Sequence, residues 1–112
     1  MALNTKNRLK KKRDLEKVFK KGKAVRGNFL FIKRLKNELD DPRFGFVVST
    51  KISRKATERN RIRRILSEAI RPLIGLIDNQ DIVVFTNIKI KDASTEEIRK
   101  EIYSVLSPTK NK

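Results

Sequence analysis

The fold of this chain depends on the stretch KATERNRIRRIL, residues 55–66. Apolar residues recur through it and just beyond it at helical spacing, and they form one stripe of Ile62, Ile65, Leu66, Ala69 and Ile70. The spacing predicts an amphipathic helix that begins at Ala56 or Thr57 and ends at Arg71, before Pro72. The chain therefore contains one long helix with an apolar side and a polar side.

The polar side of this helix is strongly basic. Asn60, Arg64 and Arg71 fall opposite the apolar stripe, and Arg61 and Arg63 flank them. Arginines four positions apart repel each other, and the helix dipole disfavours cations near a helix start. Stability alone therefore does not favour this pattern. Because Arg offers planar paired donors and Asn offers both a donor and an acceptor, the pattern indicates phosphate binding on a nucleic acid.

The segments before this helix predict strands and one more helix. We expect a helix over residues 12–21, strands over 28–36 and 44–49, and a short strand or turn over 50–55. The turn-forming residues 37–42 separate the two strands, so we expect an antiparallel hairpin.

The segments after the long helix complete one domain. The apolar run from Asp81 to Phe85 predicts a strand buried on both faces. Ser94 and Glu97 match a capping box, which opens a helix that ends before Pro108. The expected fold class is α+β, a single-domain α/β sandwich in the order α-β-β-β-α-β-α. It spans residues 1–112, with 1–7 and 109–112 flexible.

The composition of the chain points to a polyanionic partner. Among 112 residues, 29 Lys and Arg against 13 Asp and Glu give a net charge of +16. Such a small domain repels itself, and nucleic acid is the commonest partner that relieves this repulsion. No apolar run approaches the ~20 residues that cross a bilayer, and the N-terminus lacks a signal peptide. We therefore expect a soluble, cytoplasmic protein without a membrane partner.

The excess charge is gathered in two blocks. Residues 1–28 carry a net charge of +9 and residues 51–71 carry +6, whereas residues 72–112 are neutral. A solubility coat would spread the charge evenly, so the blocks indicate surfaces directed at phosphates. The chain has no Cys and no His, which excludes thiolate or His-ligated metal sites and Ser-His-Asp or Cys-His catalysis.

The stretch around Arg59, Asn60 and Arg61 closely resembles the signature helix of the bacterial ribonuclease P protein subunit. Residues 8–23 resemble that family's N-terminal segment and first helix, and residues 44–49 resemble its central strand. The resemblance runs in order from about Asn7 to Leu106. It implies a mostly antiparallel central sheet with an unusual left-handed βαβ crossover.

The resemblance also implies a function and a set of partners. Members of this family are the non-catalytic protein subunits of ribonuclease P, an endonuclease that removes the 5′ leader from precursor tRNA. The catalytic RNA subunit performs the Mg²⁺-dependent hydrolysis and binds most of the Mg²⁺, so no metal site is expected on protein side chains alone. The protein binds the catalytic RNA and the leader, and no obligate protein partner is implied.

The resemblance carries over to particular residues. Those expected on the catalytic RNA are Lys51, Arg54, Arg59, Asn60, Arg61, Arg63 and Arg64. A cleft between the first helix and the sheet is expected to hold the leader, with Leu15, Phe19 and Ile32 as its lining. Phe19 is the best single leader contact, because unpaired bases stack on aromatic rings. Leu15 and Ile32 depart from the family, which often has aromatic residues there.

Two other functions fit the sequence less well. A ribosomal or other structural RNA-binding protein shares the charge, the size and the mixed fold. A self-sufficient metal-dependent nuclease needs clustered carboxylates. The acidic residues here each have an ordinary role in a turn or a helix start, as with Asp40, Asp41, Glu96 and Glu97.

Overall fold

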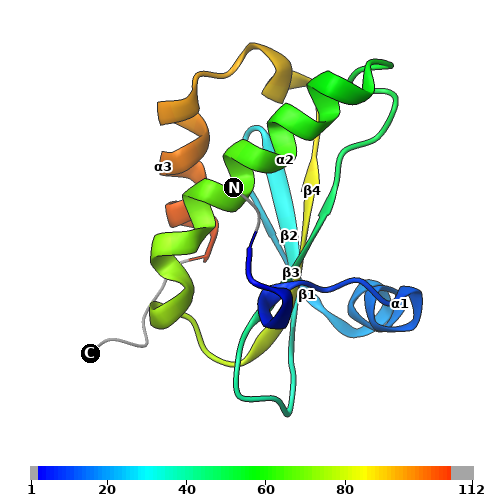
Figure 1. The fold of residues 1–112 in the computed structure, drawn as a ribbon, viewed down its shortest axis with the longest axis vertical. Helices are drawn as coiled ribbons and strands as arrows, with labels where there is room; N and C mark the ends of the chain where they lie inside the picture. The colour runs from blue at the N-terminus through cyan, green and yellow to red at the C-terminus, as the bar shows by residue number, and fades with distance from the viewer. Residues whose placement is uncertain (1–2, 107–112) are drawn as a thin grey trace.

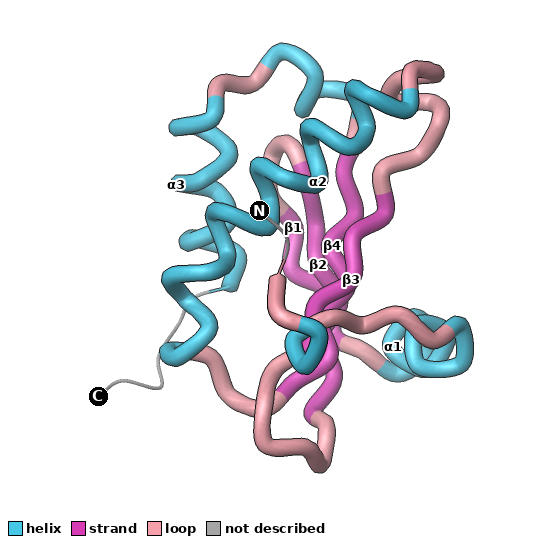
Figure 2. The backbone as a smooth tube through the Cα atoms, in the orientation of Figure 1, coloured by secondary structure: helices cyan, strands magenta, loops and turns pink. Residues whose placement is uncertain are grey.

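The computed structural model describes residues 3–106. These residues fold around one mixed sheet, against which the helices pack (Figures 1 and 2). The strands are β1 (Lys23–Arg26), β2 (Leu30–Lys36), β3 (Arg43–Val47) and β4 (Gln80–Thr86). The helices are α1 (Lys12–Lys21), α2 (Ala56–Ile70) and α3 (Thr95–Leu106), with short 3₁₀ turns at Thr5–Asn7, Arg71–Leu76 and Ile88–Asp92. The order α-β-β-β-α-β-α and the mostly antiparallel sheet are confirmed.

The sheet order is β1-β2-β4-β3, and this corrects the expected hairpin. β2 and β3 do not pair; β4 lies between them, antiparallel to β2 and parallel to β3. The reason is burial, because residues 81–85 of β4 are all buried and a strand apolar on both faces takes the centre of a sheet. The left-handed sense of the connection through α2 stays a prediction.

The hairpin partner of β2 is β1, a strand that the sequence did not suggest. β1 is a short edge strand with Lys23 and Arg26 at its ends, and charged residues on an edge discourage pairing with other chains. Residues 50–55 form a turn, in which the Ile52 amide donates to the Ser49 carbonyl at 3.0 Å. Three strands therefore precede α2, as expected, but the additional strand is β1 and not residues 50–55.

The helices cover the two faces of the sheet unequally. α2 and α3 pack over one face, where the buried strand residues are Leu30, Ile32, Phe44, Ile82 and Val84. α1 packs over the other face, against Val83 and Phe85 (Figure 1). Neighbouring residues of a strand point to opposite faces, so β4 supplies both cores. α2 begins at Ala56, as predicted, and ends at Ile70, one residue before the predicted end at Arg71. The capping box of α3 is confirmed, with Glu97 N donating to Ser94 Oγ at 3.0 Å.

The N-terminal segment lies along the open edge of β3, and the flexibility expected of residues 1–7 stays a prediction. Leu3 is 3% exposed and belongs to the core under α2. Asn7 Nδ2 donates to the Pro42 carbonyl at 2.8 Å, and the Leu9 amide donates to the Phe44 carbonyl at 2.9 Å. Pairing an edge strand satisfies backbone groups that burial would otherwise leave unpaired. Residues 109–112 lie outside the described part of the chain.

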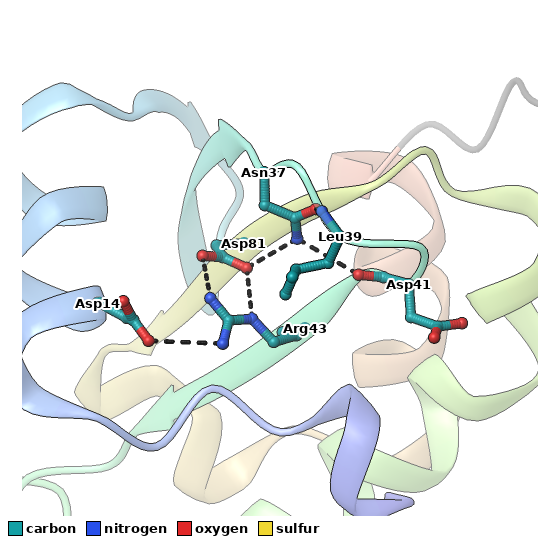
Figure 3. Close-up of polar contacts among 6 residues, drawn as sticks. All are labelled: Asp14, Asn37, Leu39, Asp41, Arg43 and Asp81. Atoms are coloured by element: carbon teal, nitrogen blue, oxygen red, sulfur yellow. Dashed lines mark hydrogen bonds and ion pairs between the residues drawn. The ribbon is translucent and has the colours of Figure 1, made fainter.

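A polar network joins α1 to the sheet (Figure 3). Arg43 donates to both carboxylate oxygens of Asp81, from Nε at 2.8 Å and from Nη2 at 2.7 Å. Its Nη1 lies 3.4 Å from Asp14 of α1, and Asn37 Nδ2 donates to Asp81 at 2.9 Å. The hydrogen bond to Asp81 raises the pKa of Arg43, and the charge of Asp14 adds to it. The network holds the start of α1 against β3 and β4.

Candidate nucleic-acid interface

A groove of about 420 Å³ runs between the N-terminal segment, β3 and α2, and we call it the arginine groove. Its polar and charged lining comes from Arg8, Lys10, Asn60, Arg63, Arg64 and Ser67, and its floor includes Phe44, Gly45 and Phe46. The lining residues of α2 are three, four and seven positions apart, which places them on one side of that helix. The two basic blocks of the sequence therefore meet here, one on each wall.

Hydrogen bonds within α2 set the shape of this groove. Arg63 Nη1 donates to Asn60 Oδ1 at 2.7 Å, and Ser67 Oγ donates to the Arg63 carbonyl at 2.9 Å. Arg64 is exposed, and none of the described residues that line the groove is acidic. A groove of this size with cations on both walls fits the backbone of a nucleic acid, whose phosphates accept from guanidinium groups.

The other predicted residues of the signature helix lie outside the groove. Arg59 is half-buried and its Nη1 donates to the Ser53 carbonyl at 3.0 Å, so it fixes the turn before α2. Lys51, Arg54 and Arg61 are exposed at that turn and on the first turns of α2.

Glu58 lies among these cations. A hydrogen bond with Ser53 lowers the pKa of Glu58, and the charges of Lys91, Arg61 and Lys55 lower it further. The carboxylate therefore stays ionised at neutral pH and neutralises part of the positive charge at the start of α2.

A row of aromatic rings lies on the α1 side of the sheet, and we call it the aromatic face. Phe31 and Phe85 stack with ring centroids 4.6 Å apart and planes 7° apart. Phe19 of α1 meets Phe85 at 5.0 Å, with its ring tilted by 52°. Phe19 is 49% exposed, so this row is open to solvent at one end. Exposed rings of this kind offer stacking surfaces to unpaired bases.

Cations flank this row of rings. Lys33 Nζ lies 5.3 Å from the Phe19 ring centre and donates to the Phe19 carbonyl at 2.9 Å. The Arg26 guanidinium lies 5.8 Å from the Phe31 ring centre. Rings and cations together form the arrangement that binds single strands, because bases stack on the rings while phosphates meet the cations.

The structure places the predicted leader-lining residues on opposite sides of the sheet. Leu15 is half-buried beside the aromatic face, and its Cδ2 would lie 3.0 Å from a Cβ added at Gly45, so the glycine permits this close approach. Ile32 is the correction: it is fully buried in the core beneath α2 and α3, on the other side of the sheet. Its neighbour Phe31 occupies the place expected for it, because adjacent strand residues point to opposite faces.

Sequence reasoning missed several residues of both surfaces. Arg8 and Lys10 line the arginine groove, and the charged first block of the sequence was a signal for them. Phe31 and Phe85 belong to the aromatic face. Both are in the predicted strands, but which face of each strand meets α1 is a property of the whole sheet.

Within residues 3–106, no three acidic side chains come together in a group that could hold a metal ion. Asp14 and Asp81 both form ion pairs with the guanidinium of Arg43.

Among the helices of this part of the chain, none has the length and apolar character that crossing a membrane requires.

Comparison with known proteins gives one family. The family model described as Ribonuclease P matches residues 3–110. The chain is 39% identical over 111 residues to the ribonuclease P protein component of Clostridioides difficile (strain 630), covering 97% of this chain and 96% of the relative. The RNase P protein of Staphylococcus aureus superposes with a TM-score of 0.84 at 31% identity, over 90% of this chain and 93% of that one. That of Thermotoga maritima gives 0.81 at 32% identity, over 88% and 94%.

Proposed function

This chain belongs to the ribonuclease P protein family, and from that premise we propose that it helps an RNA subunit to cleave precursor tRNA at the 5′ end of the mature molecule. Family membership gives it a role in the tRNA-processing complex and an association with the RNA of ribonuclease P. The finer proposal is that the RNA breaks the phosphodiester bond, in the cytoplasm, while the protein holds the RNA and the substrate in place without an obligate protein partner.

The two surfaces divide this work between them. The arginine groove, with the exposed Lys51, Arg54 and Arg61 near it, binds the backbone of the RNA subunit. Its support is the meeting of Arg8 and Lys10 with the α2 arginines across one groove. Each phosphate contact releases condensed counterions, so the groove supplies affinity that falls with added salt.

The aromatic face binds the single-stranded 5′ leader, and the observation that carries this proposal is the row of rings with a cation at each end. Phe19, Phe85 and Phe31 form a continuous row, with Lys33 at one end and Arg26 at the other. A ring that is half exposed, like that of Phe19, has apolar surface whose burial by a ligand is favourable. A leader strand would cover it by stacking its bases on the rings.

Magnesium is required by the chemistry that we propose, and the RNA subunit would hold most of it. The support is the donor set: within residues 3–106 the carboxylates are dispersed, and the close pair Asp14 and Asp81 is engaged by Arg43. Mg²⁺ prefers oxygen ligands, which RNA phosphates also provide. The protein would act by placing the leader and the RNA backbone, and by adding positive charge where phosphates crowd.

The alternative, a ribosomal or other structural RNA-binding protein, is not favoured by the comparisons, since the matching family and the solved neighbours are ribonuclease P proteins.

The test is the preference of the assembled complex for substrates with a leader. The chain is combined with the ribonuclease P RNA of its own organism, and the affinity for precursor tRNA is compared with that for mature tRNA. We expect precursor tRNA to bind more tightly, and the difference to grow as the leader is lengthened until the aromatic face is filled. Equal affinities at every leader length would contradict the leader assignment.

A further inference from the structure

A second basic groove lies where β1 begins, β2 ends and β4 begins, and it has no part in the function described so far. We call it the β1-edge groove. It measures about 610 Å³ and is lined by Lys23, Arg34, Lys36, Asp78, Asn79 and Gln80. Its lining comes from β1, β2 and the start of β4, whereas the lining of the arginine groove comes from the N-terminal segment, β3 and α2, so the two grooves share no residue.

The placement of its cations is not explained by folding stability. Lys23 and Arg34 are direct partners across β1 and β2, and like charges in that position destabilise a sheet. Lys36 lies two residues further along β2 and therefore points to the same face. A lysine at an edge discourages strand pairing, but Arg34 has a paired residue on each side, Lys23 of β1 and Ile82 of β4.

Arg34 is held in a fixed position in this groove. Its Nε donates to Gln80 Oε1 at 2.7 Å and its Nη1 donates to the Leu106 carbonyl at 3.2 Å. Burial lowers the pKa of Arg34 and the charge of Asp78 partly offsets this, so the guanidinium is a partly desolvated cation. Among the described lining residues Asp78 alone is acidic, and Lys23, Arg34 and Lys36 face it, which leaves the groove positive.

We propose that the β1-edge groove binds a phosphodiester segment of the RNA subunit, separate from the segment in the arginine groove. The proposal rests on the proposed function for the identity of the RNA. Every described lining residue is polar or charged, with amide groups beside the cations, and this set of donors suits phosphate and ribose. The groove faces the α2 and α3 side, where Arg34 reaches Leu106, whereas the leader surface is on the α1 side.

The first test uses the absence of cysteine from the chain. A single cysteine is introduced by Lys36→Cys, labelled with an azidophenacyl photocrosslinker, and the protein is assembled with the RNA subunit and precursor tRNA. Arg61→Cys serves as the positive control, and Lys100→Cys, exposed on α3 and outside the groove, as the negative control. We expect crosslinks to the RNA subunit from positions 36 and 61, and only background from position 100.

The possible outcomes separate this proposal from the function on which it rests. Crosslinks from position 61 without any from position 36 would overturn the β1-edge site alone. Crosslinks from position 36 only to precursor tRNA would overturn its assignment to the RNA subunit. The loss of crosslinks from both positions would contradict the proposed function as well.

The second test measures how strongly the affinity for the RNA subunit depends on salt when the lysines of the groove are removed. Lys23→Ala combined with Lys36→Ala should lower the slope of log affinity for the RNA subunit against log salt concentration by about 1.5, close to the value for two phosphates that are no longer neutralised. The matched control is Arg99→Ala with Lys100→Ala, exposed on α3. A slope unchanged in the groove variant, or lowered equally in the control, would overturn the site. Both variants replace exposed side chains, so thermal unfolding should stay close to that of the parent chain.

Discussion

Arg43 and Asp81 face each other across the parallel strands β3 and β4, joined by two hydrogen bonds of 2.8 and 2.7 Å (Figure 3). The pair fixes the register of two strands that are far apart in the sequence. Since Asp14 of α1 lies 3.4 Å from the same guanidinium, the pair also positions the helix that carries Phe19.

Replacing Asp81 should therefore be among the most destabilising single changes in the chain. Asp81→Ala leaves Arg43 and Asn37 without their shared acceptor, and we expect the free energy of unfolding to fall by about 3 kcal/mol. Asp41→Ala is the control, because its 3.8 Å ion pair with Lys6 is exposed and should contribute less than about 1 kcal/mol. Urea denaturation of both variants measures the difference. Similar losses would show that the pair has no special role.

Phe19→Ala should weaken the binding of precursor tRNA about tenfold and leave mature tRNA almost unaffected, since one stacked base contributes about 1–3 kcal/mol. Tyr103→Ala is a matched control: Tyr103 is 57% exposed and lies on α3, away from the aromatic face. Titration of the assembled complex with both tRNA forms provides the measurement. An equal loss for both forms would assign Phe19 to packing.

Arg61→Ala combined with Arg64→Ala should weaken binding to the RNA subunit and reduce its salt dependence by nearly one log–log unit for each phosphate that the variant no longer neutralises. Both side chains are exposed, so the fold should be retained. The measurement is the affinity at several potassium concentrations. If the variant binds more weakly but its plot of log affinity against log potassium concentration keeps the slope of the parent chain, phosphate binding by these arginines would be contradicted.

Gly45→Ala tests the close approach of α1 to β3. A methyl group there would lie 3.0 Å from Leu15 Cδ2 and 3.2 Å from the Leu9 carbonyl oxygen, and the backbone atom cannot easily yield. We expect a loss of about 1–2 kcal/mol in stability, together with a weaker preference for precursor tRNA. Gly75→Ala is the control, since beyond its own chain neighbours no described atom lies within 4 Å of the added methyl group. A stable Gly45 variant with full leader preference would mean that α1 does not need this close approach.

The sequence predicted the helices better than the arrangement of the strands. The apolar stripe of α2 and the Ser94–Glu97 cap of α3 are local patterns, and the structure agrees with them. The position of β4 between β2 and β3 is a non-local choice between apolar strands, which alternation within each strand does not encode.

The candidate site, like the fold, was predictable where its residues belong to one helix and not where the chain path brings distant segments together. Asn60, Arg63 and Arg64 were found because they lie on one helix, whereas their counterparts Arg8 and Lys10 reach the groove only through the path of the N-terminal segment along β3. Ile32 was predicted on the α1 side of the sheet, where the structure has Phe31, because the sequence does not show which face of β2 receives α1.

The central claim is that cleavage belongs to the RNA and that this protein assists it. The direct measurement is processing of precursor tRNA at physiological Mg²⁺ by the protein alone, by the RNA subunit alone, and by the two together. We expect efficient removal of the leader only when the two are combined, with none by protein stripped of RNA. Cleavage by the RNA-free protein, or equal rates with and without it, would contradict the claim.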